Sequence, residues 1–136
     1  MTKFSGRLKQ RIGVVAAVAV ATTLAGSVPA HAEGSRTTYI KAWANEKESS
    51  RWHDSHKDRN STKVQFKSCV TDRSSGFKAP LTLYRVKSLA KDPGYGKKTN
   101  TCNTSNWGEM KTVGDYYFKY HATGYVITVN TVKVSW

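Results

Sequence analysis

The segment RWHDSHKDRN at residues 51–60 places two histidines, two aspartates, three basic side chains and a tryptophan in ten positions. His53 and His56 are spaced i, i+3, which could put both imidazoles on one side of a helical turn, with an aspartate as an oxygen ligand and His121 as a third nitrogen ligand. The basic residues at positions 57 and 59 repel a cation, however. We therefore predict no metal site and no other cofactor.

The same residue types suit metal-independent cleavage of RNA, which needs two proton-transferring groups and a cation that holds the phosphate. His53 or His56 would be the first group. The candidates for the second group and for the cation lie elsewhere: His121 or Glu48, and Arg51 or Lys119. No ribonuclease motif is present, and neither G-x-S-x-G nor H-E-x-x-H occurs. A small cationic ribonuclease is thus the alternative to a non-catalytic function.

Aromatic side chains are the other candidates for contact with a partner. Trp52 lies among charged residues, so it is either an interface anchor or a side chain that folds back and caps the core. Trp107 lies on a predicted turn and is a second candidate anchor, whereas Trp136 belongs to the core or a sheet edge by its parity. The candidate binding residues are Tyr39, Trp43, Arg51, Trp52, His53, His56 and Trp107.

Apolar residues alternate with period two along the rest of the chain, which predicts strands rather than helices. The alternating segments are TTYIKAW (37–43), TKVQFKS (62–68), LTLYRV (81–86), DYYFKYHA (115–122), YVITVN (125–130) and TVKVSW (131–136). Turn-forming residues gather at 72–76, 90–100, 103–108 and 121–124. The pattern predicts one all-β domain over residues 33–136, a small immunoglobulin-like β-sandwich of six to seven strands.

Two local features refine this fold. KTVGDYYFKY (111–120) resembles the tyrosine corner of immunoglobulin-like sandwiches, in which Tyr116 or Tyr117 would hydrogen-bond back across a bend. In the last two segments the apolar positions change parity, which predicts either a β-bulge near Asn130 or a tight turn there.

A polar connection at residues 44–61 separates TTYIKAW from the next predicted strand, and it holds only two apolar side chains. Connections of this length in a small domain are uncommon unless they are functional or disordered. The connection is therefore the leading candidate for a binding segment. TTYIKAW is the candidate for a strand detached from the core.

Residues 1–32 have the order of a secretory signal peptide: a basic start, the apolar run IGVVAAVAVATTLAG, and VPAHA with small residues at Ala30 and Ala32. Because the run is shorter than the roughly 20 residues of a spanning helix, we predict cleavage after Ala32, export, and no membrane span afterwards. The four charges removed are all basic, so the formal charge becomes 13 − 4, or +9. This excess serves solubility alone or favours acidic partners.

Cys69 and Cys102 are the only cysteines, and export places them in an oxidising compartment. We predict that they form one structural disulfide. Neither has the neighbouring ligands of a zinc site or the activating group of a catalytic thiol.

The signal peptide with its alanine-rich core, the small basic mature domain and the single cysteine pair resemble small exported proteins of actinobacteria. With the separate segment TTYIKAW, the chain resembles more narrowly the adaptor subunits of secreted antibacterial toxin particles, where a disulfide-bonded β-domain joins a lectin to a toxin-bearing chain. That resemblance implies assembly by strand addition. The expected function is non-catalytic binding of another secreted protein or of an anionic cell-surface polymer. The alternatives are a secreted ribonuclease and a cell-wall-binding antimicrobial protein, and nucleic acid stays open as a partner.

Overall fold

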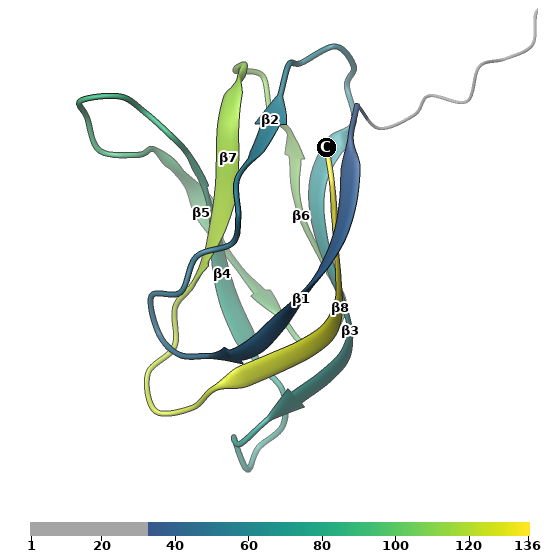
Figure 1. Cartoon of the computed structure of the whole chain (residues 1–136), viewed down its shortest axis with the longest axis vertical. Coiled ribbons are helices and arrows are strands. Elements are labelled where there is room, and N and C mark those ends of the chain that lie inside the picture. Colours follow the sequence, from purple (N-terminus) through teal and green to yellow (C-terminus); the bar gives the residue numbers. More distant parts are fainter. Residues whose placement is uncertain (1–32) are drawn as a thin grey trace, which may run out of the picture.

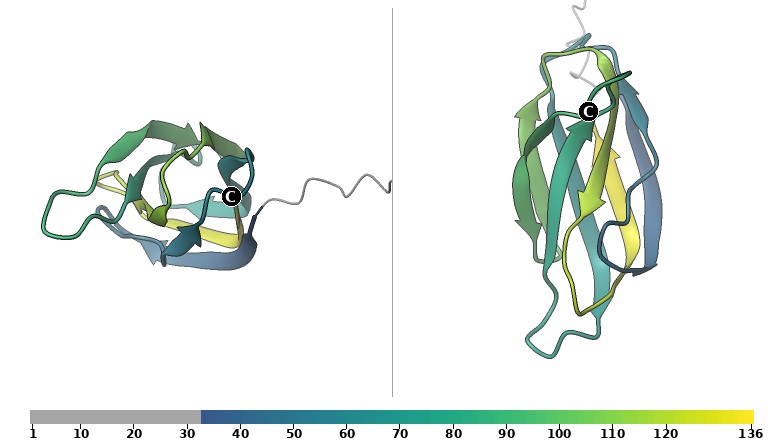
Figure 2. Two further views of the ribbon diagram at one scale, coloured as in Figure 1. Left: turned by 90° about the horizontal axis from the view of Figure 1, so that it is seen from above. Right: turned by 90° about the vertical axis from the view of Figure 1, so that its left-hand side faces the viewer.

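The computed structural model describes residues 33–136, so the predicted signal peptide lies outside the described residues. The described chain forms eight strands in two antiparallel sheets that pack face to face (Figure 1; Figure 2). The strands are β1 (Ser35–Trp43), β2 (Trp52–Asp54), β3 (Ser61–Thr71), β4 (Ala79–Arg85), β5 (Gly94–Asn100), β6 (Thr104–Glu109), β7 (Gly114–Tyr120) and β8 (Ile127–Ser135). The all-β, two-sheet prediction is confirmed, with more strands than the six to seven expected. No helix in residues 33–136 is long and apolar enough to cross a membrane.

The strand order is β1-β8-β3-β6 in one sheet and β2-β7-β4-β5 in the other. The first strand therefore pairs with the last, the second with the second last, and so on inward to β4 and β5. This is the connectivity of an eight-stranded jelly roll. It differs from the predicted immunoglobulin-like order, because period-two alternation reveals which residues face the core but not which strand lies beside which.

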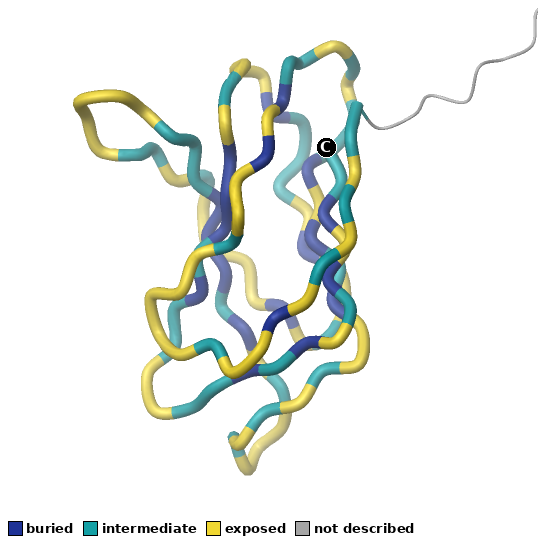
Figure 3. Tube along the Cα trace, in the orientation of Figure 1, coloured by how far each residue is buried: buried dark blue, intermediate teal, exposed yellow. Residues whose placement is uncertain are grey.

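The core lies between the sheets and takes alternate residues from each strand (Figure 3). On β7 the alternating residues Tyr116, Phe118 and Tyr120 are buried, with exposures of 0–1%. The Phe118 ring lies 5.8 Å from that of Trp43 and 6.3 Å from that of Phe66, so side chains from both sheets meet at this residue. Residues of opposite parity on these strands point away from the core.

A bulge explains the parity change near the C-terminus. β8 is one continuous strand in which Val132 faces Thr38 and Val129 faces Ile40 on β1, so that three steps on β8 match two on β1. Val129 and Val132 are both fully buried as a result, with Asn130 exposed between them. The bulge alternative is thus the correct one.

The predicted tyrosine corner is also present. The hydroxyl of Tyr116 donates to the backbone carbonyl of Thr112 at 2.5 Å across the bend before β7. Tyr117 points the other way, out of the sandwich, and its hydroxyl donates to Asp92 at 2.7 Å.

Three expectations about polar segments were wrong. The predicted turns at 90–100 and 103–108 contain β5 and β6, whose exposed and largely polar residues lack the alternation that marks a half-buried strand. The connection at 44–61 contains β2, and TTYIKAW is not detached. It lies within β1 along the length of β8, with Ile40 only 1% exposed.

A buried asparagine builds the corner where the chain crosses from β5 in one sheet to β6 in the other. The Asn100 amide nitrogen donates to the Asn103 carbonyl at 2.9 Å and to the Ser105 hydroxyl at 3.1 Å, and its oxygen accepts from the backbone N–H groups of Cys102 and Asn103. The predicted Cys69–Cys102 disulfide ties this corner to β3, with a Cα–Cα distance of 5.9 Å. The bridge and the amide together hold the two sheets at this end.

We expect Asn100→Ala to lower the free energy of unfolding by about 2 kcal/mol, because it leaves several buried donors and acceptors without partners. Urea unfolding followed by tryptophan fluorescence measures the change. Asn130→Ala removes the same side chain from an exposed position and should change the unfolding free energy by less than about 0.5 kcal/mol. Equal effects of the two variants would contradict the assigned role of Asn100.

Candidate functional site

The sheet geometry separates the residues of RWHDSHKDRN. Trp52 and Asp54 on β2 turn inward, whereas His53 between them turns outward. Trp52 is 4% exposed and packs between the rings of Tyr116 and Trp136, at 6.4 and 5.9 Å. Of its two predicted roles, Trp52 therefore has the core one, and it offers no surface to a partner.

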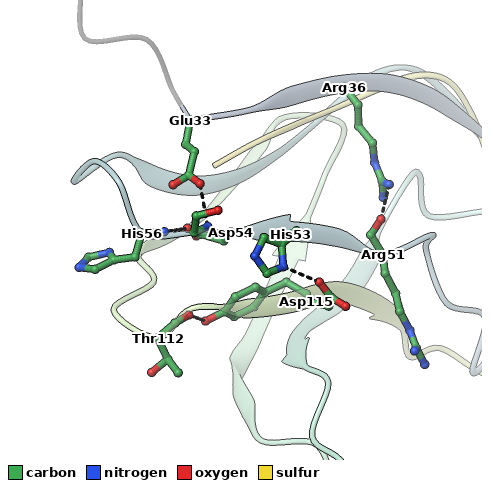
Figure 4. Close-up of polar contacts among 10 residues, drawn as sticks. Glu33, Arg36, Arg51, His53, Asp54, His56, Thr112 and Asp115 are labelled. Atoms are coloured by element: carbon green, nitrogen blue, oxygen red, sulfur yellow. Dashed lines mark hydrogen bonds and ion pairs between the residues drawn. The ribbon is translucent and has the colours of Figure 1, made fainter.

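Each histidine of the described chain faces its own carboxylate. His53 Nδ1 lies 2.7 Å from Asp115, His56 Nε2 lies 3.7 Å from Glu109, and His121 Nδ1 lies 3.3 Å from Glu46. The rings of His53 and His56 point away from one another (Figure 4). Within residues 33–136 no three His, Cys, Asp or Glu side chains are grouped to hold a metal ion.

The structure also keeps apart His53 and His121, one of the histidine pairs that RNA cleavage could use for proton transfer. His53 lies opposite Asp115, six residues along β7 and its extension from His121, a separation of about 20 Å. The Nε2 atom of His121 is buried without a hydrogen-bond partner, so a substrate in solvent does not reach it. Lys119 is held by Glu46 and Glu48, at 3.5 and 3.2 Å, rather than beside His53.

The connection around β2 is held by backbone hydrogen bonds to carboxylates (Figure 4). Glu33 accepts from the N–H groups of Ser55 and Lys57 at 2.7 and 2.8 Å, and the bond from Lys57 is the main cause that lowers the pKa of Glu33. Asp54 accepts from the His56 N–H at 2.8 Å, while burial raises its pKa. These acidic groups are therefore structural, and they shape the segment that carries the histidines.

The remaining candidate residues have different surroundings. Trp43 is partly buried against the core, and Trp107 donates from Nε1 to the Gly96 carbonyl at 2.9 Å, which links β6 to β5. Arg51 is exposed, with its guanidinium 5.8 Å from the centre of the Tyr117 ring. Tyr39 is 67% exposed and is the most accessible aromatic residue of the predicted set.

Charge is distributed unevenly among the described residues. All nine carboxylates have a hydrogen-bond or ion-pair partner within the protein. Among the lysines and arginines of residues 33–136, by contrast, Lys119 is the only one in an ion pair. Most of the positive charge of the described residues is therefore not neutralised by an ion pair within the protein.

Part of this excess lies on the outer face of the β1-β8-β3-β6 sheet. Its side chains alternate with buried residues of β3 and β8 and surround a shallow depression of about 260 Å³. The depression is lined by Lys63, Gln65, Thr104, Lys133 and Ser135, and Lys67 is exposed on the same face of β3. We call these six residues the lysine face. Sequence reasoning missed it as a site, although the alternation of TKVQFKS and TVKVSW already placed these lysines on the wet side of their strands.

The outer face of the other sheet carries a different group of side chains. The rings of Tyr84 on β4 and Tyr117 on β7 stack at 5.4 Å with 19° between their planes. Beside them lies a cleft of about 330 Å³, which we call the tyrosine cleft; it is lined by Tyr84, Ala90, Lys91, Asp92, Tyr117 and Lys119. Burial, followed by the hydrogen bond to Asp92, raises the pKa of Tyr117, so its hydroxyl stays a donor.

Comparison of the chain with protein-family models, with curated proteins and with solved structures found no match. Assignment of a function therefore rests on the two outer faces.

We expect Asp92→Asn to reduce the loss of stability in acid. The Lys87 N–H and the Tyr117 hydroxyl hold the pKa of Asp92 below its ordinary value, so its carboxylate stabilises the fold at neutral pH and loses this contribution as the pH falls below about 4. Urea unfolding from about pH 6 to about pH 2 measures the slope. Lys87→Ala keeps the backbone donor and should keep the wild-type slope. An unchanged slope in Asp92→Asn would contradict the assignment.

Proposed function

We propose that this protein is an exported, non-catalytic binding module that holds an anionic cell-surface polymer on its lysine face. The observation that carries the proposal is the grouping of Lys63, Lys67 and Lys133 on one sheet surface, around a depression whose lining residues include no carboxylate. Uncompensated like charges in one place attract a polyanion and repel cationic surfaces.

Strand register sets the spacing of these charges. Lys133 on β8 lies directly opposite Gln65 on β3, and Lys63 and Lys67 follow two positions to either side of Gln65. Neighbouring strands are about 4.8 Å apart, and second neighbours along a strand are about 6.6 Å apart. The three ammonium groups thus surround a polar centre of amide and hydroxyl groups, which suits a flexible chain with repeated negative charges.

The composition of the face favours a surface polymer over single-stranded nucleic acid. Proteins that bind nucleic acid strands without sequence preference stack bases on aromatic side chains. The side chains that line the depression are lysine, glutamine, threonine and serine. Charge attraction without stacking supports a partner whose repeating unit carries phosphate or carboxylate but no base.

The edge strands of the two sheets do not favour the strand addition that the adaptor hypothesis implies. β2 is only three residues long, β1 has two register shifts along β8, and β5 and β6 are joined by the Trp107 hydrogen bond. Short, bulged or covered edges hinder the addition of a foreign strand. An adaptor role would therefore use the outer faces of the sheets rather than an edge.

Export of the protein is supported by the signal-like N-terminus and by the Cys69–Cys102 disulfide.

The triple variant Lys63→Gln, Lys67→Gln, Lys133→Gln should bind long-chain polyphosphate at least about tenfold more weakly than wild type at low salt, because each contact ion pair in water contributes about 1 kcal/mol. Wild-type binding should itself weaken as salt is added. Fluorescence anisotropy with labelled polyphosphate measures both effects, and sedimentation with protein-free cell walls tests the natural surface.

The matched control is the triple variant Lys78→Gln, Lys97→Gln, Lys111→Gln, which removes the same charge outside the β1-β8-β3-β6 sheet. It should retain most of the wild-type affinity. Equal losses in the two variants would mean that net charge, and not the lysine face, causes binding. Tighter binding of homopolymeric RNA than of polyphosphate would reverse the choice of polymer.

A further inference from the structure

We propose that the tyrosine cleft is a second binding site, and that it takes a neutral sugar ring. The cleft lies on the sheet opposite the lysine face, between strands β4 and β7 and the connection from β4 to β5. Its volume of about 330 Å³ falls within the range of small-molecule sites in proteins.

The floor of the cleft is a fixed aromatic pair. Tyr84 and Tyr117 lie directly opposite each other in the β4–β7 register, which places their rings in contact. The Arg51 guanidinium lies 5.8 Å from the centre of the Tyr117 ring, and the Lys119 ammonium lies 5.7 Å from that of Tyr84. Tyr117 is only 5% exposed, so the half-buried Tyr84 supplies most of the accessible aromatic surface. The C–H groups on one side of a sugar ring form an apolar surface that packs on the aromatic carbons of Tyr84, at little entropic cost because Tyr117 already holds that ring.

The rim of the cleft offers oriented polar groups. One oxygen of Asp92 accepts from the Lys87 N–H at 2.9 Å and the other accepts from the Tyr117 hydroxyl at 2.7 Å. Each carboxylate oxygen has a second lone pair that can accept from a sugar hydroxyl. The Lys119 ammonium is oriented by Glu46 and Glu48, and an ammonium carries three donors, so one remains for a hydroxyl oxygen.

Charge separates this site from the lysine face. Here the cations are matched by the carboxylates of Asp92, Glu46 and Glu48, which would repel a phosphate or a uronic acid. A neutral polyhydroxyl ring meets no such penalty, because carboxylates and ammonium groups both bind hydroxyls. The sites therefore differ in ligand class and lie on opposite sheets, so that a glycan and a polyanion would bind independently.

The test is a titration of the ¹⁵N-labelled protein with cellotetraose and chitotetraose, with adenosine monophosphate and polyphosphate as comparison ligands. We expect amide shifts around Tyr84, Lys91, Asp92 and Tyr117 with at least one tetrasaccharide at millimolar concentration. Polyphosphate should instead shift amides around Lys63 and Lys133. The two proposals can thus fail separately in one experiment.

Tyr84→Leu should weaken the tetrasaccharide affinity roughly tenfold, since it removes an aromatic surface while it keeps an apolar side chain in place. Tyr39→Leu makes the same change at an exposed position on the other sheet and should leave the affinity unchanged. An amide spectrum of Tyr84→Leu that keeps the wild-type dispersion away from the cleft shows that the variant is folded. Asp92→Asn tests the rim, and should also weaken sugar binding.

Three results would overturn the proposal. The first is the absence of shifts at the cleft with both tetrasaccharides up to about 10 mM. The second is equal sugar affinity in wild type and Tyr84→Leu. The third is preferential binding of adenosine monophosphate in the cleft, which would make it a nucleotide site.

Discussion

Pairing between the two ends of the chain is the constraint on which this fold depends. β1 hydrogen-bonds with β8, β2 with β7 and β3 with β6, so that most of the ladder joins residues far apart in sequence. Closing such long loops costs chain entropy, and this cost is offset only when the strand pairs form together. The Cys69–Cys102 bridge and the Asn100 amide act at the corner between β5 and β6, near the inner end of the rolled hairpin. They hold the two sheets against each other at this end, so that the outer strand pairs β1–β8 and β2–β7 can form.

The two-sheet core in turn decides what the surface contains. Each sheet buries one face, so every second residue of a strand is left for solvent. On β3 and β8 those residues are mostly lysines and small polar side chains, whereas on β4 and β7 they include a stacked tyrosine pair with paired charges around it. One architecture thus presents two surfaces of opposite character. The lysine face presents positive charge around a depression without a carboxylate, and the tyrosine cleft has paired charges beside an aromatic pair.

RWHDSHKDRN (51–60), the segment with the highest density of reactive side chains, has a mainly structural role. Strand geometry turns Trp52 into the core, and the three histidines of the described chain each meet a different carboxylate. Density of reactive residue types along the chain was therefore a poor guide to a site, because alternate residues of a strand face opposite ways. The alternation of Lys63 and Lys67 on β3 and of Lys133 on β8 with buried residues is different, because it places these side chains on one face once the strands pair.

The sequence by itself determined the strand character of the chain, the disulfide partners and the presence of a tyrosine corner, and it limited the change of parity near Asn130 to a bulge or a tight turn. All of these follow from local alternation, turn chemistry or the count of two cysteines. Tertiary structure alone decided the strand order, the existence of β5 and β6, the burial of Trp52 and the meeting of Tyr84 with Tyr117. The physical reason is that alternation tells which side of a strand is apolar, whereas partners come from long-range hydrogen bonding between backbones that are alike in every strand. Polar strands such as β5 have no alternation of apolar and polar residues, so they are recognised as strands only by their hydrogen bonds with a neighbouring strand.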